Sequence, residues 1–244
     1  EADVVIIDEA SMIDITLMNA LLKSIKVGTR LIIVGDVDQL PSVGAGNVLN
    51  DFIESGFTKV VRLKEIFRQG KESMIVVNAH KINKGEMPKL NEKGTDFFFI
   101  RNDIQEGILN TIIDLINTRL PKFNSNWDKL KSIQVLVPMK KGVLGVTNLN
   151  ERIQNVLNPK APYKKEKEFR SMVFREGDKV MQIKNNYSLK WTRIAGKGEH
   201  EGLGVFNGDM GFIESIDLEG KKLSIIFDDE RRVIYDFMYL DELD

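Results

Sequence analysis

The chain has 244 residues and 42% apolar residues, enough for one large domain or two smaller ones with a real core. Its 35 basic and 36 acidic residues give a net charge of −1, so nucleic-acid binding would have to come from local basic patches. The absence of cysteine excludes disulfides and thiolate metal sites. With no signal peptide and no apolar segment that could span a bilayer, we expect a cytoplasmic protein without a membrane partner.

The chain opens with an apolar run that is followed by two acidic residues. Val4–Ile7 is mostly β-branched, which predicts a buried parallel strand covered on both faces. Asp8 and Glu9 follow at its carboxyl end, where open α/β sheets bind ligands. Such a pair suits phosphoryl transfer, with the Asp in a magnesium shell and the Glu polarising the attacking water. The alternative is a strand end whose acids cap the next helix.

A helix and a second strand are predicted next. Ser11 and Asp14 form a variant of a capping box, and residues 12–25 carry a helical apolar stripe. Residues 30–34 read as a strand that ends in the polar loop 35–42, so two neighbouring strands should present polar groups at one edge.

Gln39 lies in this polar loop. Its neutral amide can donate to a phosphate oxygen and accept from a water, so it can sense a γ-phosphate. The alternative is a surface turn with Asp36 and Asp38 as turn formers.

Three motifs stand in a recognisable order. They are Asp8-Glu9-Ala10-Ser11, residues 35–46 and Leu63-Lys64-Glu65-Ile66-Phe67-Arg68-Gln69. In order and spacing they resemble motifs II, III and IV of superfamily 1 DNA helicases, and most closely the RecD-like (RecD/TraA) branch. The resemblance continues through residues 78–85, 135–142, 149–154, 177–182 and 207–211, and so covers nearly the whole chain.

The resemblance implies an ATP-dependent DNA helicase of the type found as the alpha subunit of exodeoxyribonuclease V. Such an enzyme uses ATP and Mg²⁺, translocates 5′ to 3′ on single-stranded DNA and unwinds duplex DNA in repair and recombination. Its partners would be DNA and the other subunits of a helicase–nuclease complex.

The resemblance also assigns roles to four residues. Asp8 would bind Mg²⁺ through water, Glu9 would activate the hydrolytic water, and Gln39 would couple the γ-phosphate to motion. Arg68 would reach the γ-phosphate from the second motor domain, because a guanidinium is planar and permanently charged. Without the family context, Arg68 reads as an ordinary surface arginine.

The phosphate-binding loop of these enzymes is missing. The sequence contains no Gly-x-x-x-x-Gly-Lys-Ser/Thr segment. In the family this loop precedes the first strand, and the last helicase motifs would follow residue 244. We therefore expect an internal fragment of a helicase that is inactive by itself.

The second half continues the α/β alternation. Residues 97–100 and 132–138 read as strands, whereas residues 108–120, closed by Pro121, and 149–157 read as helices. The loop after the second of these strands offers a group of candidate contacts to DNA phosphates, namely Pro138, Lys140, Lys141 and Thr147. A solvated lysine pair on a turn is an equally weighted alternative.

The last part of the chain changes to short β signals. After a charged linker at residues 158–175, three strand-like segments follow at 210–216, 223–227 and 231–237. They predict a small antiparallel barrel, similar to the Src-homology-3-like insertion of RecD-like helicases. Around a loop at residues 185–187, polar and aromatic residues are candidates to grip single-stranded DNA, with packing as the alternative role of the aromatics: Asn186, Tyr187, Lys190, Trp191 and Arg193.

These observations predict an α/β fold with two partial RecA-like P-loop NTPase units and a small Src-homology-3-like β-barrel insertion. The first unit would cover residues 1–66, the second 67–184 and the barrel 185–244. Two other functions stay open, another P-loop ATPase and a non-catalytic DNA- or protein-binding module.

Overall fold

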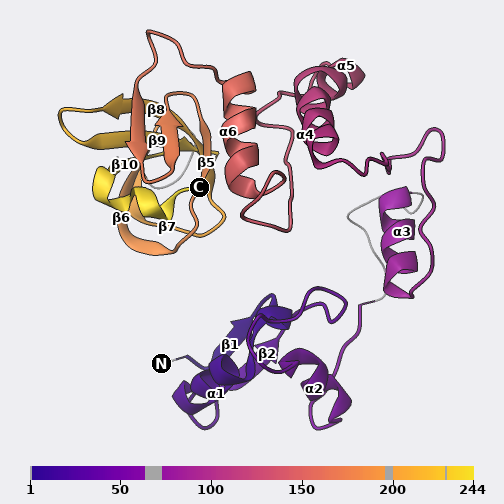
Figure 1. The fold of residues 1–244 in the computed structure, drawn as a ribbon. Coiled ribbons are helices and arrows are strands. Elements are labelled where there is room, and N and C mark those ends of the chain that lie inside the picture. Colours follow the sequence, from indigo (N-terminus) through magenta and orange to yellow (C-terminus); the bar gives the residue numbers. More distant parts are fainter. Residues whose placement is uncertain (1, 64–72, 196–199, 229) are drawn as a thin grey trace. The chain divides into compact units, whose positions relative to one another are not determined.

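The computed structural model describes residues 2–63, 73–195, 200–228 and 230–244 (Figure 1). The chain divides into two compact units, Glu1–Ile100 and Arg101–Asp244. The predicted α/β class is confirmed, because parallel strands and helices build the first unit and helices and an antiparallel sheet build the second. Within the described ranges, no helix is long and apolar enough to cross a membrane.

A parallel strand pair forms the centre of the first unit. Strand β1 (Val4–Ile7) pairs with β2 (Arg30–Ile33), and helix α1 (Ile15–Ser24) connects them. Asp14 caps α1 by accepting a hydrogen bond of 2.7 Å from the amide of Leu17. The predicted capping box at Ser11 is wrong, because a 3-10 turn occupies Ala10–Met12 and delays the helix start.

The prediction that β1 is covered on both faces is also wrong. Val5 and Ile7 are half-buried, whereas 44% of Val4 and 66% of Ile6 are exposed. Only β2 pairs with β1 among the described strands, and the alternating exposure along both strands shows that one face of the pair is covered.

Helices α2 (Val48–Glu54) and α3 (Met74–Asn83) follow in the first unit. Two side chains tie α3 to the segment that comes after it. The buried side chain of Asn78 exchanges two hydrogen bonds of 2.8 Å with the backbone of Lys89. Asp96 caps α3 by accepting from the Ser73 hydroxyl and the Met74 amide, and these bonds lower the pKa of its carboxyl. Residues 97–100 continue from this cap without forming the predicted strand.

The second unit begins with helices. Helix α4 (Gln105–Asp114) passes through a π-helical turn (Leu115–Arg119) into α5 (Leu120–Phe123). Pro121 therefore does not end the helix as predicted. The helix widens into the π-helical turn just before this proline and then continues as α5. Helix α6 (Val146–Leu157) packs against α4. The strand predicted at residues 132–138 does not form, because no other described segment pairs with it.

A six-stranded antiparallel sheet completes this unit and curls around its own core, in the order β5-β8-β9-β10-β6-β7. Its strands are β5 (Lys179–Met181), β6 (Asn186–Arg193), β7 (Glu201–Val205), β8 (Met210–Asp217), β9 (Lys222–Phe227) and β10 (Arg231–Asp236). The last three confirm the predicted strands, whereas β6 begins within the predicted loop at residues 185–187. The predicted linker contains a further hairpin, β3 (Glu166–Phe169) with β4 (Met172–Arg175).

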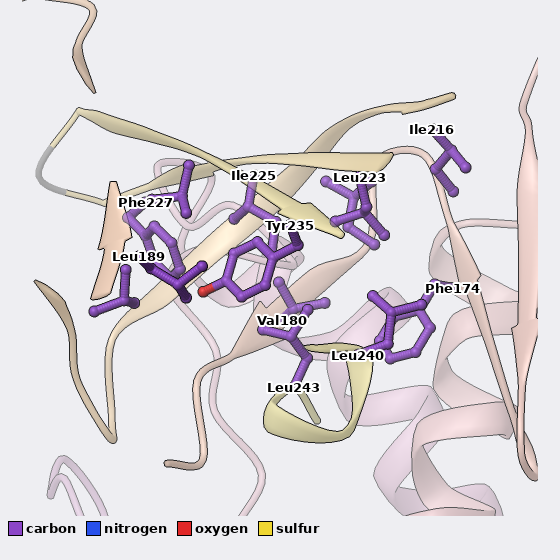
Figure 2. Close-up of a cluster of buried hydrophobic side chains, with 13 residues drawn as sticks. Phe174, Val180, Leu189, Ile216, Leu223, Ile225, Phe227, Tyr235, Leu240 and Leu243 are labelled. Atoms are coloured by element: carbon purple, nitrogen blue, oxygen red, sulfur yellow. The ribbon is translucent and has the colours of Figure 1, made fainter. Parts of the chain in front are cut away.

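Apolar side chains from all six of these strands, from β4 and from the C-terminal segment with its 3-10 helix (Phe237–Glu242) form the core of this barrel. Figure 2 shows Tyr235 in the middle of the cluster, with Ile225 and Leu223 near it. The hydroxyl of Tyr235 donates a 2.8 Å hydrogen bond to the buried amide oxygen of Gln182. Burial of this hydroxyl raises its pKa, so it stays a donor.

We predict that Ile225→Ala destabilises the barrel by about 2–5 kcal/mol, because it leaves a cavity in a packed core. Ile234→Ala is the matched control, since Ile225 is 0% and Ile234 57% exposed in the same sheet. Urea unfolding followed by circular dichroism measures both. Equal effects of the two substitutions would contradict the assigned faces of the sheet.

Candidate functional site

Backbone hydrogen bonds continue the β1–β2 pairing beyond the strand ends. The amide of Val34 donates to the carbonyl of Ile7 at 2.7 Å, and the amide of Ala10 donates to the carbonyl of Val34 at 2.9 Å. The residues after each strand, Asp8 and Glu9 on one side and the loop from Gly35 on the other, therefore lie at one edge. The prediction that two strands present polar groups at the same edge is confirmed.

The acidic pair has an unusual backbone. Glu9 lies in the left-handed region with φ 51° and ψ 39°, which costs an L-residue roughly 1–2 kcal/mol. Asp8 accepts the Glu9 amide through Oδ1 at 2.9 Å, and both side chains are exposed. Strained residues of this kind concentrate at functional sites, and composition or periodicity gives no sign of them.

The loop after β2 approaches the acidic turn closely. A Cβ added at Gly35 would lie 2.8 Å from Leu49 Cδ2, 3.0 Å from the Ala10 amide nitrogen and 3.1 Å from the Ser11 amide nitrogen. Only glycine fits there without displacement. Ser11 is 8% exposed, and its Oγ has no hydrogen-bond partner within the described part of the chain. Sequence reasoning assigned Ser11 to a cap and missed this open buried hydroxyl.

Gln39 lies in a turn built on Asp36. The Asp36 carboxylate accepts the Asp38 amide at 3.0 Å, and its carbonyl accepts the Gln39 amide at 3.3 Å. Asp36 is therefore the turn former that the sequence suggested, and the Gln39 side chain is exposed in the same loop. Arg68 lies outside the described residues. The catalytic roles of Asp8, Glu9, Gln39 and Arg68 stay predictions.

The second group of candidates gathers at the start of α6. The carbonyl of Lys140 accepts from the amide and the hydroxyl of Thr147, each at 3.3 Å. This brings Lys140 next to the first turn of the helix, while Pro138 and Lys141 lie exposed in the same loop. The structure therefore brings Lys140 and Thr147 together, and their role in DNA binding stays a prediction.

The two barrel candidates differ in their surroundings. The Asn186 amide donates to both carboxylate oxygens of Glu242, at 3.1 and 2.9 Å, which ties β6 to the final 3-10 helix. Tyr187 is 71% exposed and contacts the Phe206 ring edge-on at a centroid distance of 5.6 Å. Tyr187 thus offers an aromatic face to a ligand, whereas Asn186 already has a structural task.

A buried carboxylate fixes α6 to the barrel. Asp178 accepts from Gln154 Nε2 at 2.6 Å, from Asn158 Nδ2 at 2.7 Å and from the Arg175 amide at 2.7 Å. Burial raises the pKa of Asp178, and the hydrogen bonds oppose this shift. The helix that carries Thr147 is therefore held rigidly against the sheet that carries Tyr187.

Comparison with known proteins agrees with this geometry. Residues 1–105 match the family described as an AAA domain, and residues 149–227 match the ATP-dependent RecD-like DNA helicase SH3 domain. The chain is 31% identical over 226 residues to the ATP-dependent RecD2 DNA helicase of Deinococcus radiodurans. The chain is similar to RecD-like DNA helicases. This confirms the predicted resemblance and the Src-homology-3-like character of the barrel.

The matches differ in how much of each chain they cover. The RecD subunit of the RecBCD enzyme of Mycolicibacterium smegmatis is 48% identical over 69 residues, which are 28% of this chain and 12% of that subunit. The RecD2 match covers 93% of this chain and 27% of RecD2, so the chain spans about a quarter of that relative. A solved structure of Pif1 helicase from Bacteroides with ADP-AlF3 and ssDNA is 18% identical with a TM-score of 0.47, over 96% of this chain and 52% of Pif1.

We predict that Asp178→Ala lowers the free energy of unfolding of the second unit by about 3–5 kcal/mol, because it leaves buried hydrogen-bond donors without a partner. Asp228→Ala is the control, since that aspartate is exposed. Denaturant unfolding measures both variants. A loss below about 1 kcal/mol for Asp178→Ala would show that α6 and the barrel do not depend on this carboxylate.

Proposed function

We propose that this chain is part of a RecD-like helicase, which hydrolyses ATP, translocates 5′ to 3′ on single-stranded DNA and unwinds duplex DNA. The observation that carries the proposal is the edge at which Asp8 and Glu9 meet the Gly35 loop, with Glu9 in a left-handed conformation. The similarity to RecD2 supports the choice of helicase over another P-loop ATPase. The direction of translocation rests on the resemblance alone.

The donor set at this edge fits a Mg²⁺–nucleotide complex. One oxygen of Asp8 accepts the Glu9 amide, and the carboxylate is otherwise exposed. A single carboxylate that acts through water is a common way to hold Mg²⁺ beside phosphates, and no cluster of three or more acidic or histidine residues exists in the described ranges. The open hydroxyl of Ser11 provides a further polar group two residues beyond Glu9.

Each residue then has a separate task. Bound ATP supplies the phosphoryl group that is transferred to water. Asp8 holds the water shell of Mg²⁺, Glu9 takes the proton of the attacking water, and Gln39 contacts the γ-phosphate and reports its presence. Arg68 stabilises charge on the transferred group from the second motor domain. Pro138, Lys140, Lys141, Thr147, Asn186 and Tyr187 form the DNA-contacting set.

The arrangement of the whole protein is part of the proposal. The first motor domain ends near residue 66, the second continues to residue 184, and the barrel is inserted after it. DNA in single-stranded and duplex form is the substrate. RecD is named as a subunit of the RecBCD enzyme, which makes other subunits of a helicase–nuclease complex candidate partners.

Glu9→Gln tests the hydrolytic site in a protein that carries this chain together with a phosphate-binding loop. The substitution keeps the shape of the side chain and removes the base, so ATP turnover should fall by roughly 10²–10⁴-fold while nucleotide affinity stays nearly unchanged. A coupled ATPase assay and nucleotide titration measure the two quantities. Glu54→Gln, an exposed acid at the end of α2, is the control and should be silent. Unchanged turnover in Glu9→Gln would make Glu9 structural.

Arg68→Ala in the same protein tests the two-domain mechanism. Because an arginine acts on the transition state only when the cleft closes, hydrolysis should fall on the order of 10³-fold with little change in DNA affinity. Lysine should restore little activity, since a point charge lacks the planar fork of donors. Weakened DNA binding with normal turnover would instead place Arg68 on the DNA backbone.

A further inference from the structure

A cavity of about 210 Å³ lies beside the turn of the β3–β4 hairpin. Four separate parts of the second unit form its walls: Lys140 and the start of α6 with Thr147, the hairpin with Arg170 and Met172, Ile183 after β5, and the last residues of the chain with Asp241 and Asp244. We call this cavity the hairpin groove. Sequence reasoning placed these hairpin residues in a solvated linker, so the groove appears only when the strands pair.

Two cations, Arg170 and Lys140, line the hairpin groove. The guanidinium of Arg170 lies over the Phe169 ring at 5.1 Å from its centroid. Among the described residues, neither Arg170 nor the ammonium of Lys140 makes an ion pair within 4 Å. Beside them, the Thr147 hydroxyl donates to the Lys140 carbonyl and keeps its own oxygen free to accept. These groups suit an anionic oxygen-rich ligand.

Apolar side chains and two acids, Asp241 and Asp244, complete the lining of the hairpin groove. The apolar residues are Val146, Met172, Ile183 and Leu243. Of the acids, Asp241 pairs with Lys184 at 2.6 Å, and this pairing, together with the charge of Arg170, lowers the pKa of its carboxyl. An inorganic anion would use only the cations, whereas a ligand with both a charged and a flat apolar part would use the whole surface.

Arg170 is held in a backbone conformation that disfavours it. Its φ is 54°, in the left-handed region, at a two-residue turn between Phe169 and Met172. Glycine or asparagine occupies such positions at lower cost. Glycine would therefore be the more favourable turn residue at this position, yet the chain has an arginine there, and this arginine lines the hairpin groove.

We propose that the hairpin groove binds one nucleotide unit of single-stranded DNA. Arg170 and Lys140 contact its phosphate, Thr147 offers a further polar contact, and the sugar and base lie over Met172 and its apolar neighbours. The proposal deepens the proposed helicase function, on which its choice of a DNA strand rests. It adds Arg170 to the DNA-contacting residues and joins Lys140 and Thr147 to it in one site.

The test uses the full 244-residue chain and a fluorescently labelled oligothymidine strand, with binding measured by anisotropy at several salt concentrations. Arg170→Gly removes the guanidinium and suits the positive φ, so the variant should fold at least as well as the parent. Lys221→Gly is the matched control, because Lys221 is a cation with φ 53° in the β8–β9 turn. Both variants lose one positive charge, so any effect of net charge is shared.

We expect Arg170→Gly to reduce the slope of log affinity against log salt by about 0.7, which is a roughly 5-fold loss at about 0.1 M salt. Lys221→Gly should bind like the parent, and Lys140→Ala should resemble Arg170→Gly. Unlabelled thymidine monophosphate separates a strand site from a free-nucleotide site, and it should compete only weakly.

Three results would contradict the binding of a DNA strand in the hairpin groove. They are equal affinity of Arg170→Gly and Lys221→Gly, efficient competition by the mononucleotide in the parent but not in Arg170→Gly, and no binding of the strand at low salt. None of these uses ATP hydrolysis. Failure of the groove is therefore distinguishable from failure of the hydrolytic site, which the Glu9→Gln comparison tests separately.

Discussion

The hydrogen bonds that join Ile7, Val34 and Ala10 are the constraint on which the candidate nucleotide site depends. They extend a parallel pairing past the ends of β1 and β2, so both chains leave the sheet at the same level. Gly35 permits this close approach, since any side chain there would meet Leu49 and the backbone of Ala10. The acids, the Ser11 hydroxyl and the Gln39 loop are brought to one edge by this backbone pairing.

In the second unit the corresponding constraint is a single buried carboxylate. The barrel core is apolar and continuous, and packing alone accounts for its closure. Helix α6 contributes no side chain to that core, so it needs another attachment. Asp178 supplies this attachment by accepting from two side chains of the helix and its end, Gln154 and Asn158. A polar contact of this kind fixes one orientation, because its donors must all be satisfied at once.

Strands were predicted correctly where a segment has both an alternating apolar pattern and a neighbouring strand to pair with. The strands at 210–216, 223–227 and 231–237 alternate and have turns between them, and all of them form. Residues 97–100 and 132–138 have strand-like composition, yet a strand also needs a neighbour, and among the described residues they have none. At residues 158–175 the charges of Lys164 to Glu168 indicated a solvated linker, yet the segment forms a hairpin whose Phe174 packs in the barrel core. For the site, the motif predicted the shared edge, whereas the strain at Glu9 and the open hydroxyl of Ser11 emerged only from the three-dimensional structure.

Five non-glycine residues of the described chain have positive φ, and three of them lie in hairpins whereas Asn91 and Glu9 do not. Arg170, Lys221 and Glu230 lie in turns between paired strands, where the hairpin itself requires a left-handed residue. Glu9 lies in no hairpin. A left-handed residue changes the direction of the chain within one step, and here this lets the very next amide, that of Ala10, reach the carbonyl of Val34. Glycine would make the same turn at lower cost, so the turn alone does not account for a glutamate. What the glutamate adds is a carboxylate, exposed at the edge where Asp8 and the Gln39 loop also end, and the proposed hydrolysis of a nucleotide at this edge would use that carboxylate as its base.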